Sequence, residues 1–403
     1  MKKFELGIVG GSASGLVAAI NAKYLHPNIS LVIFEKNQRL GKKILATGNG
    51  RCNLTNVHAL EHEYINYDFA KYSLNKYCPT KIIDFFSMLG LLTYTDEKGR
   101  VYPRSNNASS VLDALRFEIE KLNIDVILDY TVDKVTFTDK FIINDEFICD
   151  KLIIATGGKS SSSQGSDGSG YKIAKSLGHS ITPLYPALVP LNSRPELVRS
   201  LKGVRATNTF LTVSDSITES KSEGEILFTD NGVSGIAAME LASMAEKILR
   251  NGNKPLLNID FLPELSLEEL KKYLNYTIIH KQGQSMDNLL TGILPKQIGI
   301  QILKSCNIYY GGAVISDFSD NMISEIVKSI KCFSLEITGT KGFANSQVTC
   351  GGINCKEIDK ETMKSLLVDN LYFCGEIIDV DGRCGGFNLQ WAFASGLTAG
   401  ELK

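Results

Sequence analysis

The chain has 403 residues, enough for two or three domains, and its 43% hydrophobic and 22% charged residues are typical of a folded globular protein. A formal net charge of −1 gives the chain no strong long-range electric field. This disfavours a nucleic-acid-binding or membrane-surface protein. Nine scattered cysteines without a CxxC pair indicate free thiols in a reducing, cytoplasmic compartment and no metal site. No apolar run reaches the length of about 18 residues that a membrane span needs.

Residues 1–35 predict a strand, a tight turn, a helix and a second strand. Residues 4–9 and 29–34 are short apolar runs, and the segment between them has helical spacing. The turn, GGSASG at residues 10–15, occupies the place of the dinucleotide-binding pattern G-x-G-x-x-G. Glu35 ends the second strand twenty residues after Gly15, where that pattern has its acidic residue.

The physical role of each position in this unit follows from the pattern. Gly10 allows the tight turn, Gly15 lets the helix pack closely on the strand, and Glu35 accepts hydrogen bonds from an adenosine ribose. Ser12 replaces the second glycine and is still small enough for a pyrophosphate to approach the backbone. Because residue 35 is acidic, the site disfavours the 2′-phosphate of NADP and leaves NAD and FAD as alternatives.

The chain then continues as an α/β pattern that ends in a biased segment. Helical patterns occur at residues 81–91 and 111–122, and strands are predicted at residues 125–128, 132–138, 141–143 and 151–155. In residues 157–170, eleven of the fourteen are Gly or Ser, which is too flexible for a strand or a helix. This segment is either a linker or a loop folded over a ligand. A helical pattern follows at residues 171–177, and His179 is interpreted as a cap at its end.

A different pattern begins near residue 188. Short strands and turns extend to residue 261, with one helix at 236–249, and residues 263–310 are mostly helical, with a capping box at Ser266 and Glu269. Strand character returns at residues 334–337. The predicted organisation is a first domain part (1–188), a β-rich insert (189–262), a helical subdomain (263–312), a return of the insert (313–333) and a second domain part (334–403).

The C-terminal segment has the same order of elements as the first turn: a strand, glycines and a helix. An apolar strand at residues 371–374 leads into Gly375, an acidic loop follows, and Gly385 and Gly386 precede an almost wholly apolar helix. A strand, a close-approach glycine and a helix N-terminus form a site for an electron-rich group. Two such units at opposite ends of the chain predict one extended cofactor that is held by both ends of one fold.

Several further motifs resemble one family along essentially the whole chain. They are GKK at residues 41–43, TGNGRCNLTN at 47–56, ATGG at 155–158, GEILFT at 224–229, QVTCGG at 347–352, EID at 357–359 and GEIIDVDGRCGGFNLQWAFASG at 375–396. The chain resembles a family of bacterial flavoproteins that have been described as aminoacetone-oxidase-like or bile-acid-reductase-like. The resemblance implies a glutathione-reductase-type Rossmann FAD domain made from both chain ends, with an inserted β-barrel-like domain and a small helical subdomain.

The resemblance also implies which residues contact FAD. Those at the pyrophosphate and adenosine half would be Gly10, Ser12, Ala13, Gly15, Glu35, Lys36, Gly41, Lys42, Lys43, Val135 (through its backbone, at the adenine), Thr156 and Gly157. Those at the ribityl and flavin half would be Thr47, Gly48, Arg51, Cys52, Asn53, Gly375, Glu376, Asp379, Gly385, Gly386, Phe387 and Asn388. The last four would place a helix N-terminus at the flavin N1/O2 edge, where a reduced flavin carries negative charge.

Departures from the family pattern fall on the expected substrate side. Cys384 stands where relatives have a small residue, Thr or Gln; residues 230–231 also differ, and the family's Ser-Gly-Pro is Ser-Gly-Ile at 234–236. Cys384 is interpreted as an inert small residue, with a reactive thiolate as the alternative. Arg51 is interpreted as a brace for the flavin, with binding of a substrate carboxylate as the alternative.

The expected function is that of an FAD-dependent oxidoreductase that transfers a hydride between flavin and a small or medium organic substrate. The favoured reaction is reduction of activated C=C bonds by transiently bound NAD(P)H, since no second dinucleotide unit is visible. One alternative is an amine oxidase of the aminoacetone type that uses oxygen, and a second is a tRNA- or RNA-associated flavoprotein, which the net charge disfavours. The sequence identifies neither a catalytic residue nor the substrate, and it leaves the oligomeric state open.

Overall fold

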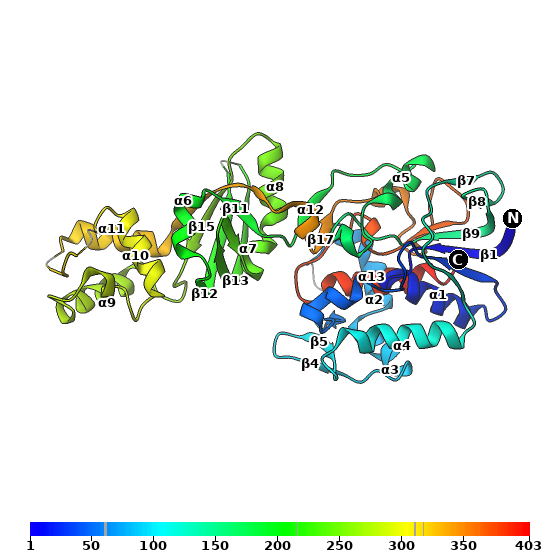
Figure 1. The fold of residues 1–403 in the computed structure, drawn as a ribbon, viewed down its shortest axis with the longest axis horizontal. Helices are drawn as coiled ribbons and strands as arrows, with labels where there is room; N and C mark the ends of the chain where they lie inside the picture. Colours follow the sequence, from blue (N-terminus) through cyan, green and yellow to red (C-terminus); the bar gives the residue numbers. More distant parts are fainter. Residues whose placement is uncertain (60–62, 216, 310–311, 317) are drawn as a thin grey trace. The chain divides into compact units, whose positions relative to one another are not determined.

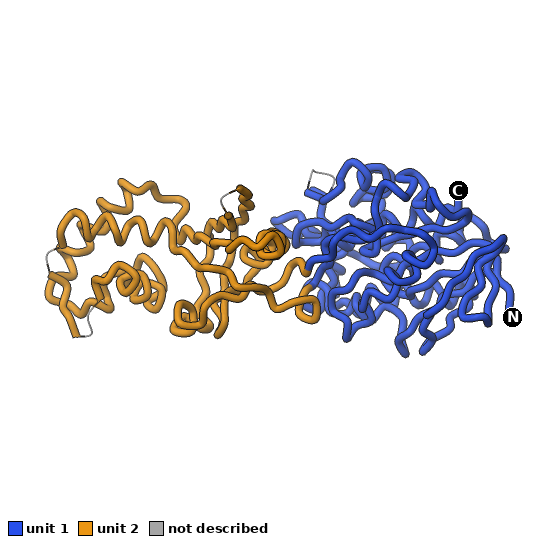
Figure 2. Tube along the Cα trace, turned by 90° about the horizontal axis from the view of Figure 1, so that it is seen from above, with its two compact units in different colours: residues 1–185, 347–403 blue, residues 186–346 orange. Residues whose placement is uncertain are grey.

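The computed structural model describes residues 1–59, 63–215, 217–309, 312–316 and 318–403 (Figure 1). The chain forms two compact units (Figure 2): unit 1 comprises residues 1–185 and 347–403, and unit 2 comprises residues 186–346. Unit 1 is therefore built from both ends of the chain.

Unit 1 contains a seven-stranded sheet with the order β6-β2-β1-β9-β8-β7, in which β18 also pairs with β9. The pairs β1–β2, β1–β9, β2–β6 and β9–β18 are parallel. The bounds of these parallel strands are β1 (Lys2–Val9), β2 (Leu31–Phe34), β6 (Asp125–Ile127), β9 (Phe147–Ile154) and β18 (Leu371–Phe373). Strands β7 (Val135–Phe137) and β8 (Phe141–Ile143) pair antiparallel. The strands β2 and β18 are buried at every residue, as parallel strands covered on both faces require.

Helices from opposite ends of the chain pack against each other in unit 1. Helix α1 (Ala13–Leu25) contacts α13 (Phe387–Ala399) (Figure 1). A Cβ atom at Gly396 would lie 2.5 Å from the carbonyl oxygen of Ser14, and one at Gly400 would lie 2.5 Å from that of Ala18. The two glycines therefore allow a close approach of the backbones that any larger residue would prevent.

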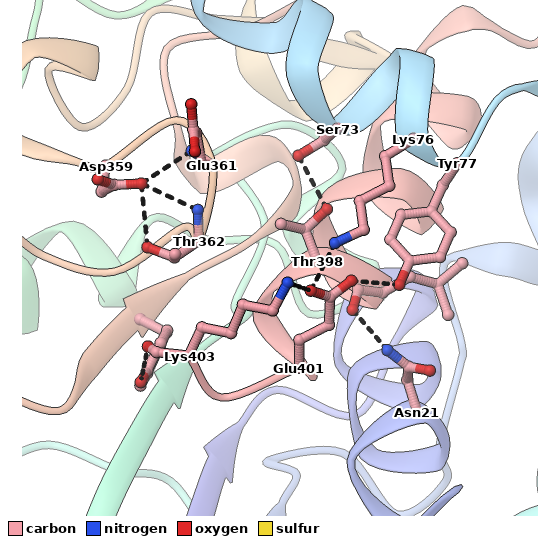
Figure 3. A network of polar contacts seen from close by, with 12 residues as sticks. Asn21, Ser73, Lys76, Tyr77, Asp359, Glu361, Thr362, Thr398, Glu401 and Lys403 are labelled. Carbon is pink, nitrogen blue, oxygen red and sulfur yellow. Dashed lines mark hydrogen bonds and ion pairs between the residues drawn. The ribbon is translucent and has the colours of Figure 1, made fainter. Parts of the chain in front are cut away.

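A buried carboxylate fixes the end of α13 (Figure 3). Glu401 accepts hydrogen bonds from Lys76 Nζ at 2.6 Å, from the Tyr77 hydroxyl at 2.5 Å and from Lys403 Nζ at 2.8 Å. Nearby, Asn21 Nδ2 of α1 donates to the carbonyl oxygen of Leu397 at 2.6 Å. The C-terminal helix is thus joined by polar contacts to α1 and to the end of α2 (Tyr67–Lys76).

The remaining elements of unit 1 surround this sheet. A small antiparallel sheet has the order β3-β5-β4, and β10 pairs with β17. The bounds in unit 1 are β3 (Thr55–Asn56), α3 (Pro79–Met88), β4 (Thr93–Thr95), β5 (Arg100–Pro103), α4 (Ala108–Lys121), α5 (Ser169–Ser176) and β17 (Val348–Cys350). Strand β10 (Tyr185–Ala187) spans the boundary between the units, and α12 (Gly342–Asn345) belongs to unit 2.

Unit 2 contains a closed barrel with the strand order β11-β14-β13-β12-β15-β16. The bounds are β11 (Leu191–Ser193), β12 (Arg205–Ser214), β13 (Glu219–Thr229), β14 (Gly232–Ser234), β15 (Leu256–Asp260) and β16 (Phe333–Thr340). Its helices are α6 (Pro195–Val198), α7 (Ile236–Glu240), α8 (Ala242–Arg250), α9 (Leu267–His280), α10 (Lys296–Ser305) and α11 (Asp320–Lys331). The predicted α/β fold class with an inserted barrel and a helical subdomain is confirmed.

Local predictions in unit 2 differ from the structure in two places. The barrel includes β16, so unit 2 extends to residue 346, past the boundary expected at 333/334, because residues 333–337 pair with β15 and β11. The helix expected at 236–249 is divided at Leu241 into α7 and α8. The capping box is confirmed, since Ser266 Oγ accepts from Glu269 N and Glu269 Oε2 accepts from Ser266 N. The expected helical subdomain, 263–312, includes residues 310 and 311, which lie outside the described residues.

Candidate cofactor site

The site lies where the parallel strands of unit 1 end. Because β1, β2, β9 and β18 run in the same direction, their carboxyl ends meet at one edge of the sheet. Gly10, Glu35, Ala155 and Gly375 directly or closely follow these ends. Strand β2 lies on one side of β1 and strand β9 lies on the other, so the strand order reverses at β1. Such a topological switch point is the usual ligand position in open α/β sheets.

The turn between β1 and α1 is tightly packed. Gly10 has φ +107°, and a Cβ atom there would lie 2.5 Å from the carbonyl oxygen of Ala155. A Cβ atom at Gly15 would lie 1.9 Å from the carbonyl oxygen of Gly10. The N–H groups in the first turn of α1, which begins at Ala13, have no acceptor within the helix. Ser12, the N-cap residue, does not satisfy them, because its side chain makes no capping hydrogen bond. This geometry suits a pyrophosphate.

Glu35 is held in place by its neighbours. Its Oε2 accepts from the backbone N–H of Gly11 at 2.8 Å, and its Oε1 accepts from the backbone N–H of Asn37 at 2.8 Å. The side chain is buried, with 6% of the residue exposed. A fixed carboxylate at the end of β2 is the arrangement that binds a ribose hydroxyl.

The TGNGRCN and GGFN motifs, predicted to share the flavin end, are adjacent. Asn53 Oδ1 lies 3.0 Å from the position that a Cβ atom at Gly386 would take. Asn56 Nδ2 donates to the carbonyl oxygen of Gly385 at 3.0 Å, and Thr55 Oγ1 donates to Gln390 Oε1 of α13 at 2.6 Å. Residues 53–56 are therefore joined directly to the N-terminal end of α13.

The backbone around this motif is in an unusual conformation. Gly48 and Cys52 both have φ +56°, and the backbone N–H of Cys52 donates to the carbonyl oxygen of Thr47 at 3.0 Å. Burial raises the pKa of the Cys52 thiol to about 12, despite a hydrogen bond with Thr47 that acts in the opposite direction. Cys52 is therefore a neutral, buried side chain and not a thiolate nucleophile.

Arg51 stacks on the ring of Tyr102, a residue that was not among the predicted site residues. Its guanidinium lies 4.6 Å from the ring centroid of Tyr102, and Arg100 lies 5.9 Å from the same ring. Arg100 is paired with Asp96 at 2.7 Å. The Arg-x-Tyr spacing of β5 places Arg100 and Tyr102 on one face of a strand, and this was the only signal in the sequence. The stack favours a bracing role for Arg51.

Glu376 is a charged junction between three segments of unit 1. It pairs with Lys43 at 2.7 Å, and it accepts from the backbone N–H of Thr349 at 2.7 Å and from that of Gly158 at 3.4 Å. The preceding Gly375 has φ +79°, and a Cβ atom there would lie 2.5 Å from Ser14 Oγ of α1. The sequence-predicted residues Lys43, Gly375 and Glu376 are thus brought together with the first helix.

The other predicted residues are positioned as follows. Gly41 donates its N–H to the carbonyl oxygen of Gly11 at 2.8 Å. The side chain of Asn388 holds the acidic loop, since its Oδ1 accepts from Gly382 N at 2.9 Å and its Nδ2 donates to Gly382 O at 2.8 Å. The carbonyl oxygen of Asp379 accepts from Asn66 Nδ2, and that of Phe387 accepts from the Tyr64 hydroxyl. Val135 lies in β7, which β9 and β8 separate from β1, so its contact with an adenine stays a prediction.

Unused polar atoms in this part of unit 1 fit a bound cofactor. Asn53 Oδ1, Ser166 Oγ and the Tyr171 hydroxyl are buried and have no hydrogen-bond partner among the residues that the structure describes. Burial raises the pKa of Tyr171 well above its usual value, and the charges of Glu376 and Asp379 add to the effect. Together with the turn at Gly10, the carboxylate of Glu35 and the N-terminus of α13, these atoms fit an extended dinucleotide such as FAD.

His179 belongs to a separate, buried cluster. Its ring nitrogens lie 3.1 Å from Glu357 Oε2 and 2.8 Å from Ser365 Oγ, the geometry of a serine–histidine–carboxylate triad. Ser365 Oγ also accepts from the backbone N–H groups of Leu367 and Val368, and Ser365 is 5% exposed. A hydroxyl so enclosed joins elements rather than attacks a substrate. The backbone of His179 does close the end of α5, by donating to the carbonyl oxygen of Ala174.

Fold and site together define a Rossmann-type flavoprotein. The chain belongs to the family described as HI0933-like protein Rossmann domain, whose family model matches residues 4–402. By family and fold it is an FAD-dependent oxidoreductase, as the sequence predicted.

The chain is similar to two named relatives and to one solved structure. It is 36% identical to 3-dehydro-bile acid delta(4,6)-reductase of Clostridium scindens, over 98% of both chains. It is 29% identical to ribosomal RNA dihydrouridine synthase of Escherichia coli, over 98% of this chain and 96% of that one. The structure of 3-ketosteroid delta1-dehydrogenase from Sterolibacterium denitrificans shares the fold, with a TM-score of 0.52, 11% identity and coverage of 99% of both chains. Among the helices of the described residues, none has the length and apolar character to cross a membrane.

Proposed function

We propose that this protein is an FAD-dependent reductase of C=C bonds conjugated to a carbonyl group, with NAD(P)H as a transient electron donor. The observation that carries the proposal is the 36% identity, over 98% of both chains, to a reductase that acts on a 3-dehydro-bile acid. The second relative is named for dihydrouridine, which differs from uridine by saturation of a C=C bond beside a carbonyl group. Both names therefore describe reduction of the same kind of bond.

The residues at the flavin end suit this chemistry. When bound, FAD would supply the hydride. The N-terminus of α13 offers N–H groups and a partial positive charge, which stabilise negative charge at the pyrimidine edge of a reduced flavin. Arg51, stacked on Tyr102, adds a fixed positive charge at the same end, and this charge would favour electron density that moves onto a substrate carbonyl.

Transient binding of the nicotinamide donor is supported by the glycine-rich segment. A second resident dinucleotide would need its own strand, turn, helix and acidic residue. The glycines of residues 157–170 do not provide such a unit, because this segment contacts the first site: Lys42 Nζ donates to the carbonyl oxygen of Ser163 at 2.8 Å, and Lys36 pairs with Asp167 at 2.7 Å.

The donor and the acceptor are tested in one anaerobic experiment. The purified protein is loaded with FAD, reduced with NADH or NADPH, and mixed with a conjugated enone, with the saturated ketone as control. We expect the enone alone to restore the spectrum of oxidised flavin. Reoxidation by oxygen and by no enone, together with flavin reduction by an amine, would instead establish the amine oxidase.

Reduction of uracil in ribosomal RNA is the second candidate function, and the 29% identity to a ribosomal RNA dihydrouridine synthase favours it. The charges oppose it. Unit 1 has 27 Lys and Arg against 27 Asp and Glu, and unit 2 has 16 against 17. An RNA enzyme draws much of its affinity from contacts between basic side chains and phosphate. We therefore expect no salt-dependent binding to ribosomal RNA in a gel shift, and micromolar binding that weakens with salt would reverse this preference.

A further inference from the structure

The glycine- and serine-rich segment 157–170 is fastened to unit 1 at several points. At its start, the backbone N–H groups of Lys159 and Ser160 donate to Thr349 Oγ1 at 2.8 and 3.0 Å. At its end, the backbone N–H of Gly168 donates to the carbonyl oxygen of Gly158 at 3.0 Å, which closes the segment on itself. These contacts are incompatible with the linker that the sequence left open as an alternative.

The middle of the segment is fastened to Lys36, Asn37 and Lys42, which follow Glu35 in the chain. Asp167 pairs with Lys36 at 2.7 Å, and the carbonyl oxygen of Ser163 accepts from Lys42 Nζ. A Cβ atom at Gly165 would lie 2.4 Å from Asn37 Nδ2, so the backbone packs directly on that side chain. The segment therefore crosses the carboxyl ends of β2 and β9, where the cofactor is expected.

Ser166 lies between these fastened residues and has an unused hydroxyl. The residue is 5% exposed, and its Oγ has no hydrogen-bond partner within the described part of the chain. That oxygen is 3.1 Å from the position a Cβ atom at Gly157 would take, and Gly157 follows Ala155 and Thr156, which contact Gly10. A buried hydroxyl without a partner costs free energy unless a ligand supplies one.

We propose that residues 157–170 form a strap over the cofactor, in which the Ser166 hydroxyl donates a hydrogen bond to a pyrophosphate oxygen of FAD and the Lys36–Asp167 ion pair holds it there. This inference rests on the FAD binding in the proposed function. Ser166 is the binding residue, and Asp167 and Lys36 are positioning residues.

The charges around Ser166 agree with a phosphate ligand. The nearby carboxylate of Glu376 is paired with Lys43, and that of Asp167 with Lys36, so neither presents an uncompensated negative charge. Burial alone would raise the pKa of Asp167, but hydrogen bonds from Lys36 and Ser169 lower it to about 2, which keeps the ion pair intact at neutral pH. A hydroxyl that donates to an ionised phosphate forms a stronger hydrogen bond than one between neutral groups.

The hydroxyl is tested by measuring FAD affinity rather than turnover. The apoprotein is titrated with FAD and flavin fluorescence is followed, for Ser166→Ala and for Ser162→Ala, an exposed serine of the same segment. Loss of one charge-assisted hydrogen bond should weaken FAD binding about tenfold in Ser166→Ala. Ser162→Ala should bind as the unmodified protein does, and equal affinities for both variants would overturn the assignment of Ser166.

The ion pair is tested by a double-mutant cycle. Lys36→Met, Asp167→Asn and the double variant are compared for the rate at which FAD dissociates. If both residues act through the strap, each single variant should release FAD several-fold faster and the double variant no faster than either. Multiplied effects in the double variant would show that Lys36 and Asp167 act independently, which would contradict a shared positioning role.

The outcomes separate this inference from the proposed function. An unmodified protein that binds no FAD would refute the proposed function and leave no strap to test. An unmodified protein that binds FAD, with Ser166→Ala unchanged, would refute the strap alone. Melting of each apoprotein, followed by circular dichroism, should show that the variants are folded.

Discussion

Single residues decide where a cofactor is able to lie in this chain. Gly10, Gly15 and Gly375 have no side chain at the places where a backbone or a hydroxyl comes within contact distance, and Asn53 brings an amide oxygen to the N-terminus of α13. That oxygen is buried without a hydrogen-bond partner among the described residues. A flavin has an N–H group on its pyrimidine ring, and we expect Asn53 Oδ1 to accept from it.

Replacement of Asn53 tests this acceptor. Asn53→Leu preserves the approximate volume and removes the oxygen, so it should weaken FAD binding by about 1–2 kcal/mol, or roughly tenfold. Fluorescence titration of the apoprotein measures the change. Asn275→Leu, at an exposed asparagine of α9, is the control, and an affinity for FAD unaffected by Asn53→Leu would exclude the hydrogen bond.

Among single residues, the sequence predicted the site residues that belong to one motif. It did not predict those that reach the site only because the fold brings distant segments together. Gly10, Gly15 and Glu35 belong to one βαβ unit, and their spacing alone defines their roles. Tyr102 and Ser166 were missed because neither belongs to a pattern with a known spacing. Their relevance depends on which segments the fold brings beside them, namely Arg51 for Tyr102 and Gly157 for Ser166.

Among the elements, the packing of α1 against α13 joins the two ends of the chain, and a buried polar cluster joins α5 to the C-terminal segment. In that cluster, Glu357 accepts hydrogen bonds from His179 Nδ1 and from the backbone N–H of Ser180, and Ser365 lies on the other ring nitrogen of His179. Burial lowers the pKa of His179, although the charge and hydrogen bond of Glu357 act in the opposite direction. The ring is therefore neutral in the folded protein near pH 7.

This cluster makes the stability of the protein depend on pH. Because the pKa of His179 is lower in the folded state than its unfolded value of about 6.5, the unfolded chain binds the proton more readily. Stability should be fully present above about pH 6.5 and fall as the pH decreases, by at most about 1.4 kcal/mol per pH unit from this residue. Urea unfolding of the unmodified protein and of His179→Asn at about pH 7.5 and about pH 5.5 measures the effect. A pH dependence that is the same in both proteins would contradict this assignment.

Element boundaries were predictable where a local signal marks them. The capping box at Ser266 and Glu269 starts α9 at the expected residue. The return of the chain to unit 1 was not predictable, since the strand expected at residues 334–337 carries no local signal for the sheet that it joins. Its pairing with β15 and β11 is a long-range choice that no local pattern encodes.

For the whole molecule, we expect unit 1 to bind the cofactor and unit 2 to contribute residues that contact the substrate. Every residue predicted to contact FAD lies in unit 1. Of the departures from the family pattern, residues 230–231 and Ile236 lie in unit 2, and Cys384 lies in unit 1. The fold class could be predicted from the two glycine-rich turns at opposite chain ends, whereas the substrate could not, because this chain departs from the family pattern at positions that are expected to face the substrate.

This division is tested by removing unit 2. A variant in which a short glycine–serine linker replaces residues 186–346 should bind FAD within about tenfold of the unmodified affinity, because the two segments of unit 1 form one core. It should have no measurable enone reduction. Failure of the folded variant to bind FAD would show that unit 2 contributes to the cofactor site.

The central claim is that the flavin held by both chain ends reduces a C=C bond conjugated to a carbonyl group. The most direct measurement is a single turnover without oxygen, in which chemically reduced, FAD-loaded protein is mixed with one equivalent of a 3-keto-4-ene steroid and the products are analysed. We expect oxidised flavin and one equivalent of the saturated ketone to appear together. Flavin that stays reduced with this and other conjugated enones, yet is reoxidised at once by oxygen, would contradict it.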